Sequence, residues 1–212
     1  ADDCAPIVAL ARALGARGLE VACVYVSSLK DPLAAAPLRR WIASARPDVI
    51  LNTTAFSGRL DEAPGVLESA DAPILQVILA GSSEAQWSDS QRGLGAADLA
   101  MNVVLPEIDG RIITRAISFK AAGEHNDVLE FARLAHRPLP SRVDFVAALA
   151  ANWAALRRKP ARAKKLALIL SDYPAKGGRA GYAVGLDTPQ SALTIARRLA
   201  DEGYAIEARP GA

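Results

Sequence analysis

Apolar and polar positions along the chain alternate between a helical period and a strand-like period. Helical spacing, together with residues that favour helix starts and ends, predicts helices over residues 5–15, 31–46, 126–135, 141–158 and 188–202. Short apolar runs bounded by turn residues predict strands over residues 19–26, 48–52, 72–79, 98–105, 111–118, 164–170 and 204–208.

The order of these elements predicts the fold class. Strands that alternate with helices through short loops are typical of a parallel sheet with covering helices, so we predict a Rossmann-like α/β domain over residues 1–160. Residues 98–118 break the alternation and predict a β-rich insertion at the edge of the sheet. A connecting helix over residues 141–158 would lead to a boundary near Pro160, and residues 161–212 would begin a second α/β unit.

Composition excludes several functional classes. Lys and Arg number 25 and Asp and Glu 23, and no basic stripe alternates with aromatic residues, so we expect no nucleic-acid partner. No apolar run reaches the ~18 residues of a membrane span, and no signal peptide is recognised, so we expect no membrane association. Cys4 and Cys23 have no metal-binding spacing and predict buried thiols in a reducing cytoplasm. The first residue is not Met, which suggests a piece of a longer protein.

Polar loops follow three of the predicted strands, and ligands of open α/β sheets bind beyond the carboxyl ends of strands. Candidate ligand-binding residues in these loops are Thr53, Thr54, Ser82, Ser83, Lys176, Arg179 and Tyr182. Capping and turn formation explain the Thr and Ser residues equally well. The glycine-rich loop over residues 171–187 has neither GxGxxG nor GxxxxGK[ST] spacing, so it predicts no nucleotide phosphate site.

The sequence PEIDG, residues 106–110, places the carboxylates of Glu107 and Asp109 two positions apart. One interpretation is a strand-turn-strand corner in which Asp109 and Gly110 form the turn. The other is a carboxylate pair that attracts a divalent cation or accepts a proton. His125 lies in a polar stretch and has no HExxH or HxxxH partner, so by itself it is a weak metal ligand.

Three long stretches resemble the large subunit of aerobic cobaltochelatase, the CobN type, which is related to the porphyrin-binding H subunit of magnesium chelatase. The stretches are RPDVILNTTAFS, RGLGAADLAMNVVLPEIDGRIITRAISFK and SDYPAKGGRAGYAVGLDTPQSAL, in that order. The resemblance extends over nearly the whole chain. It implies that this chain is an internal segment of a longer subunit and that the segment is inactive alone.

The resemblance implies ATP-dependent insertion of Co²⁺ into hydrogenobyrinic acid a,c-diamide, a step of cobalamin biosynthesis. It also implies two smaller partner subunits, one an AAA+ ATPase that hydrolyses ATP in place of this chain. A glutamate of the related magnesium enzyme is implicated in catalysis in the matching region, which implies a catalytic and metal-binding role for Glu107 and, less directly, a catalytic role for Asp109. His125 would be an additional metal ligand.

Residue chemistry adds that Lys176 and Arg179 would contact corrinoid carboxylates and that Tyr182 would stack on the ring or form a hydrogen bond to it. The alternatives are the porphyrin-binding subunit of magnesium chelatase and a non-catalytic ligand-binding or docking module.

Overall fold

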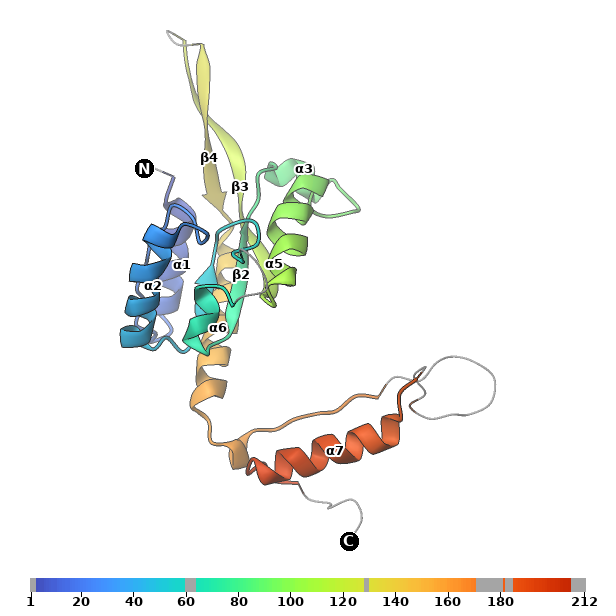
Figure 1. The fold of residues 1–212 in the computed structure, drawn as a ribbon. Helices are drawn as coiled ribbons and strands as arrows, with labels where there is room; N and C mark the ends of the chain where they lie inside the picture. The colour runs from blue at the N-terminus through green and yellow to red at the C-terminus, as the bar shows by residue number, and fades with distance from the viewer. Residues whose placement is uncertain (1–2, 60–63, 128–129, 171–180, 182–184, 207–212) are drawn as a thin grey trace. The chain divides into compact units, whose positions relative to one another are not determined.

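The structure is a computed structural model and describes residues 3–59, 64–127, 130–170, 181 and 185–206 (Figure 1). The chain divides into two compact units, Ala1–Ala154 and Ala155–Ala212. Lys176, Arg179 and Tyr182 lie outside the described residues.

The first unit is built on a mixed sheet with the strand order β1-β2-β3-β4. Strands β1 (Ile50–Asn52), β2 (Ile74–Leu79) and β3 (Ile112–Asn126) are parallel, and β4 (Phe131–Pro138) is antiparallel to β3. Asn52 lies opposite Gln76, which in turn lies opposite Ile113. The carboxyl end of β1 therefore lies beside the middle of β2 and the start of β3.

One face of the sheet packs against α1 (Ala5–Gly15) and α6 (Pro140–Arg158). Leu75 and Val77 of β2 and Ile117 of β3 are fully buried there. Helix α6 contributes the small residues Ala147 and Ala150 to this core, which lets the helix approach the sheet closely.

The other face packs against α3 (Glu84–Ser88) and a continuous helix made of α4 (Ala96–Leu99), the π-helical turn η2 (Ala100–Val104) and α5 (Leu105–Ile108) (Figure 1). Trp87 and Phe119 pack there with their ring centroids 5.0 Å apart.

Near β1, a separate cluster joins α2 (Pro32–Ala45) to the 3₁₀ turn η1 (Leu67–Ala70). Asp31 caps α2: its carboxylate accepts the backbone N–H of Leu33 at 2.9 Å, and Pro32 takes the first helical position.

The second unit contains η3 (Ala161–Ala163) and α7 (Thr188–Asp201). Helix α7 is capped by Asp187, whose side chain accepts the N–H of Gln190 at 3.0 Å, and Thr188 is the first helical residue. The predicted boundary near Pro160 and the predicted second α/β unit stay predictions. None of the helices that the structure describes has the length and apolar character needed to cross a bilayer.

The α/β class, with a mostly parallel sheet and covering helices, is confirmed, but the predicted β-rich insertion is wrong. Residues 98–105 are helical. Val103 packs against the sheet from this helix, and Leu99, the last residue of α4, leads directly into η2. Residues 111–118 do form a strand, but as part of β3 inside the sheet.

The helix predicted over residues 126–135 is also wrong, because Asn126 ends β3 and residues 131–135 belong to β4. Figure 1 shows β3 and β4 continuing together as a two-stranded ribbon past the other strands. Pairing with β3 outweighs the helical spacing of this segment. Residues 19–26 and 164–170 are described but form no strand, and Cys4 and Cys23 are exposed rather than buried.

His136 on β4 provides a test of this packing. Its Nδ1 lies 3.1 Å from the Oγ of Ser118, a fully buried residue, and burial lowers the pKa of His136 below its usual value. The unfolded chain therefore binds a proton more readily as the pH falls through about 6.5, so the free energy of unfolding decreases below that pH.

We expect His136→Gln to reduce this decrease in urea unfolding experiments between pH 7.5 and about 5. His125→Gln is the matched control, because the His125 side chain is 56% exposed. Equal pH dependence in His136→Gln and the unchanged chain would contradict the burial of His136.

Candidate functional site

A tight turn connects α5 to β3 and brings two charged side chains inside the protein. Asp109 follows the last residue of α5, and its N–H donates to the carbonyl of Pro106 at 3.1 Å. Gly110 has φ 73°, a conformation that residues with a Cβ rarely adopt, and its N–H donates to the carbonyl of Glu107 at 2.9 Å. The turn places Asp109 and Arg111 on the same inward side.

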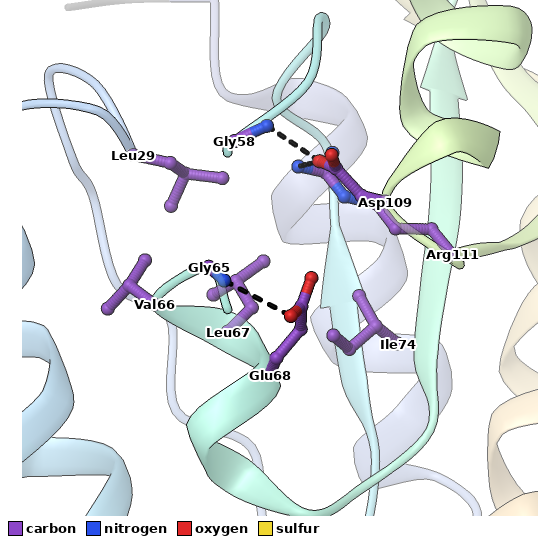
Figure 2. A pocket seen from close by; sticks show the side chains of 9 residues that line it. All are labelled: Leu29, Gly58, Gly65, Val66, Leu67, Glu68, Ile74, Asp109 and Arg111. Carbon is purple, nitrogen blue, oxygen red and sulfur yellow. Dashed lines mark hydrogen bonds and ion pairs between the residues drawn. The ribbon is translucent and has the colours of Figure 1, made fainter. Parts of the chain in front are cut away.

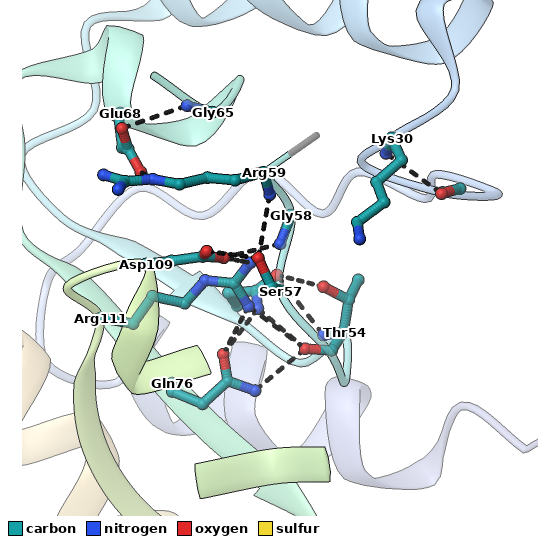
Figure 3. A network of polar contacts seen from close by, with 12 residues as sticks. Lys30, Thr54, Ser57, Gly58, Arg59, Gly65, Glu68, Gln76, Asp109 and Arg111 are labelled. Atoms are coloured by element: carbon teal, nitrogen blue, oxygen red, sulfur yellow. Dashed lines mark hydrogen bonds and ion pairs between the residues drawn. The ribbon is translucent and has the colours of Figure 1, made fainter. Parts of the chain in front are cut away.

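Asp109 and Arg111 form a buried ion pair (Figure 3). Arg111 Nη2 donates to Asp109 Oδ2 at 2.8 Å, and the two side chains are only 3% and 4% exposed, respectively. The carboxylate also accepts the hydroxyl of Ser57 at 2.5 Å and the N–H of Gly58 at 2.6 Å. Both oxygens of Asp109 thus accept hydrogen bonds from donors that surround the carboxylate.

Two buried amides extend the ion pair into the sheet. Gln76 Oε1 accepts Arg111 Nη1 at 3.0 Å and Asn52 Nδ2 at 2.7 Å. The carbonyl of Thr54 accepts hydrogen bonds from Asn52 Nδ2 and Gln76 Nε2, each at 3.0 Å. Arg111 Nη1 lies 3.5 Å from the same carbonyl oxygen. Each polar group in this buried row has a partner, which avoids the cost of an unpaired buried donor or acceptor.

The loop of residues 53–59 is fixed at a second place by the π-helical turn. Leu105 N–H donates to the carbonyl of Ala100 rather than to that of Met101, and Pro106 has no N–H to donate. The carbonyl of Met101 instead accepts the N–H of Phe56 at 2.8 Å. Phe56 has φ 66°, which is strained for a residue with a Cβ, and its side chain is 50% exposed.

A small pocket borders the ion pair (Figure 2). Asp109, Arg111 and Glu68 line it, and its volume of about 10 Å³ leaves room for about one water molecule. Glu68 accepts Arg59 Nε at 2.9 Å and the N–H of Gly65 at 3.1 Å. An open depression of about 400 Å³ lies alongside and is lined in part by Glu68, Asp71 and Gly110.

The pKa values of Arg111 and Arg59 shift in opposite directions because the surroundings of the two side chains differ. Burial lowers the pKa of Arg111, and the neighbouring charge of Asp109 opposes that change. The pKa of Arg59 is raised, first by its hydrogen bond to Glu68. Both guanidinium groups therefore remain charged at neutral pH, and Arg111 depends on Asp109 to be buried in that form.

The structure separates the residues for which the sequence predicts metal binding. Glu107, in the last turn of α5, is exposed, and its side chain has no hydrogen bond or ion pair within the described part of the chain. His125 lies near the far end of β3, 3.8 Å from Asp127. At about 3.3 Å per strand residue, roughly 40 Å separates His125 from the start of β3, so these two side chains do not meet. The described residues contain no cluster of three or more His, Cys, Asp or Glu that would suit a metal ion.

The predicted loop residues make mostly local contacts. Thr54 Oγ1 donates to Asn52 Oδ1 at 2.9 Å, and Thr53 is half-buried in the same loop. Ser82 Oγ donates to Asp98 at 3.0 Å, and Ser83 forms a capping box with Gln86 at the start of α3.

Sequence reasoning missed Arg111, Gln76 and Asn52. Gln76 and Asn52 are polar residues inside short apolar strand runs, and such a residue must find a buried partner. The position of Gln76 and Asn52 within apolar runs was therefore the signal in the sequence that could have identified these two residues. Arg111 stands just after the Asp109-Gly110 turn, where no motif marks it.

Comparison with known proteins places the chain in a family. The whole chain, residues 1–212, matches the model of the CobN/magnesium chelatase family, so the chain belongs to that family.

Among particular relatives, the chain is 48% identical to the aerobic cobaltochelatase subunit CobN of a Sinorhizobium species and 41% identical to that of Pseudomonas aeruginosa. These alignments cover 95% and 93% of this chain but 16% of each relative. The magnesium-chelatase subunit ChlH of Oryza sativa is 27% identical over 96% of this chain and 15% of its own length.

A solved structure shares the fold. The catalytic subunit of cobaltochelatase from Mycobacterium tuberculosis superposes with a TM-score of 0.72 and is 32% identical, over 95% of this chain and 17% of that one. The chain thus spans about a sixth of the length of the relatives that it matches.

Removing one partner of the buried pair tests the energetics of the site. We expect Asp109→Asn and Arg111→Met each to lower the free energy of unfolding by about 3–5 kcal/mol, because each leaves a buried charge without its counterion. The double variant should lose less than the sum of the two single losses. Urea unfolding followed by circular dichroism measures all three.

Arg17→Met is the matched control, because Arg17 pairs at 2.6 Å with Asp144, which is 66% exposed. It should cost less than about 1 kcal/mol. Equal losses in Arg17→Met and Arg111→Met would show that burial of the Asp109–Arg111 pair has no energetic consequence.

Proposed function

We propose that this chain is part of the catalytic subunit of a cobaltochelatase, which inserts Co²⁺ into hydrogenobyrinic acid a,c-diamide in cobalamin biosynthesis in the cytoplasm. Two smaller subunits, one an AAA+ ATPase, assemble with the full-length subunit and hydrolyse ATP. The observation that carries the proposal is the identity of 48% to an aerobic cobaltochelatase subunit, against 27% to a magnesium-chelatase subunit over a similar share of the chain.

Within this function we assign metal handling and proton acceptance to Glu107 rather than to Asp109. Insertion requires the ion to lose water and the ring nitrogens to lose protons. A carboxylate that is free to move can replace water on the ion and then accept a proton. Glu107 is exposed and has no partner among the described residues, whereas Asp109 already accepts Ser57, Gly58 and Arg111. Asp109 therefore supports the site and leaves the chemistry to Glu107.

The full-length subunit with its partner subunits should insert Co²⁺ into hydrogenobyrinic acid a,c-diamide when ATP is supplied, and it should bind that acid more tightly than protoporphyrin. Absorbance spectra of the metallated product measure insertion, and fluorescence titration measures binding. Tighter binding of protoporphyrin, with insertion of Mg²⁺, would replace this function with that of a magnesium chelatase.

Glu107→Gln should lower kcat for cobalt insertion by about 10²-fold or more, because an amide neither accepts the ring proton nor carries charge for the ion. Binding of the corrinoid acid should change little. Glu20→Gln, at another exposed glutamate of the same unit, should retain full activity. Normal turnover of Glu107→Gln would favour the alternative that this segment is a non-catalytic docking module.

A further inference from the structure

Arg111 joins three segments that are far apart in the sequence. Its guanidinium contacts Asp109 at the end of the continuous helix, Gln76 in β2, and the carbonyl of Thr54 in the loop after β1. Figure 3 shows this guanidinium lying between the carboxylate of Asp109 and the amide of Gln76.

The pair connects the loop of residues 53–59 to the turn that carries Glu107. Asp109 receives the hydroxyl of Ser57 and the N–H of Gly58, and it lies two positions beyond Glu107 in a hydrogen-bonded turn. A shift of Asp109 therefore moves both the loop and the last helical turn. Arg111 limits such a shift because it holds Asp109 Oδ2 and Gln76 Oε1 at once.

The loop fits closely around the guanidinium. A Cβ added at Gly58 would lie 2.9 Å from Arg111 Nη2, nearer than side-chain carbons normally come. The loop also holds Phe56 at φ 66° with its ring half exposed, so the backbone there is strained and depends on its anchors. Contacts on both sides of the ion pair therefore fix the position of the loop of residues 53–59 relative to the end of α5.

A hydrophobic pair would hold these segments at a lower desolvation cost. Exchanging a buried ion pair for apolar residues of similar volume is often neutral or stabilising, so the pair is not needed for stability as such. The charge and the forked shape of the guanidinium add direction, because Nη2 bonds Asp109 while Nη1 bonds Gln76, and this fork tolerates only a few placements of its two partners.

We infer that Arg111 is a positioning residue for metal insertion, which acts through Asp109 to hold Glu107 and the loop of residues 53–59 in the arrangement that acts on the substrate. This inference rests on the proposed function and adds to it a residue that does not touch the substrate. It predicts that Arg111 matters for turnover only while Glu107 is present.

A double-mutant cycle in the full-length subunit, assayed with its partner subunits, tests this coupling. The variants are Arg111→Lys, Glu107→Gln and the two together, with kcat for cobalt insertion and the dissociation constant of the corrinoid acid as readouts. Lysine keeps the charge beside Asp109 but lacks the fork that reaches Gln76 as well. Arg111→Lys should lower kcat about 10–100-fold and change the dissociation constant less than about 3-fold, since small misplacements cost rate more than binding.

In the Glu107→Gln background, Arg111→Lys should lower kcat by less than about 3-fold more, because the group it positions is already absent. Arg17→Lys is the matched control and should retain normal kcat. An equal factor in both backgrounds, or an effect on corrinoid binding alone, overturns the inference and leaves cobalt insertion intact. Full activity of the Glu107→Gln variant also overturns the inference and leaves cobalt insertion intact. Absence of insertion by the unchanged complex overturns the proposed function, and this inference with it.

Ser57 offers a milder version of the cycle for the case in which Arg111→Lys does not fold. Ser57→Ala removes one hydrogen bond to Asp109 and leaves the ion pair in place. It should lower kcat about 3–10-fold when Glu107 is present and hardly at all in Glu107→Gln. Ser57→Thr keeps the hydroxyl and should restore most of the rate. Equal losses in Ser57→Ala and Ser57→Thr overturn the inference, because they would follow from packing rather than from the bond to Asp109.

Discussion

The ion pair between Asp109 and Arg111 is the contact on which the arrangement of this region depends. A charged group loses several kcal/mol of hydration when it is buried, and the pair recovers this only through good geometry and further hydrogen bonds. Here the carboxylate has three donors, and the guanidinium also contacts Gln76. The requirement to satisfy these charges brings the loop after β1, the middle of β2 and the start of β3 together. Apolar packing alone does not determine that these three segments contact one another, because hydrophobic interactions have no preferred direction.

Elements with strong local signals could be predicted from the sequence, and elements that depend on distant contacts could not. Helix α2 has Asp31 as its cap and Pro32 at its first position, and β2 is an apolar run, so both were predicted correctly. Residues 98–105 contain Val103, Val104 and Leu105, which suit a strand, and a proline such as Pro106 is typical of a strand end. The π-helical turn accommodates Pro106 within the helix, and nothing in the local pattern marks such a turn. Residues 126–135 show the opposite error, since pairing with β3 decides their structure.

The candidate site was predicted in part. The sequence PEIDG drew attention to Asp109, and the structure finds it buried with three donors. Its partner Arg111 was not predicted, because an arginine after a glycine turn is more often exposed than buried. The inward direction of Arg111 follows from the positive φ of Gly110 and from the amide of Gln76, which is reached only when β2 and β3 pair. Pairings of this kind belong to the tertiary structure and leave no local trace in the sequence.

The size of the pocket constrains how this segment would serve the proposed function. A pocket for a drug-sized ligand has a volume of roughly 300–1,000 Å³. The pocket beside Asp109 and Arg111 has a volume of about 10 Å³, which no macrocycle enters. The open depression of about 400 Å³ beside Gly110 falls within that range, so under the proposed function the corrinoid contacts the surface of this unit, at that depression or at the loop and helix end where Phe56 and Glu107 are exposed. Under the proposed function, parts of the subunit beyond this chain would cover the rest of the corrinoid, since this chain spans 16% of its cobaltochelatase relatives. A segment that presents one carboxylate to a site closed by other domains needs a rigid base more than it needs a cavity, and the buried ion pair supplies that base.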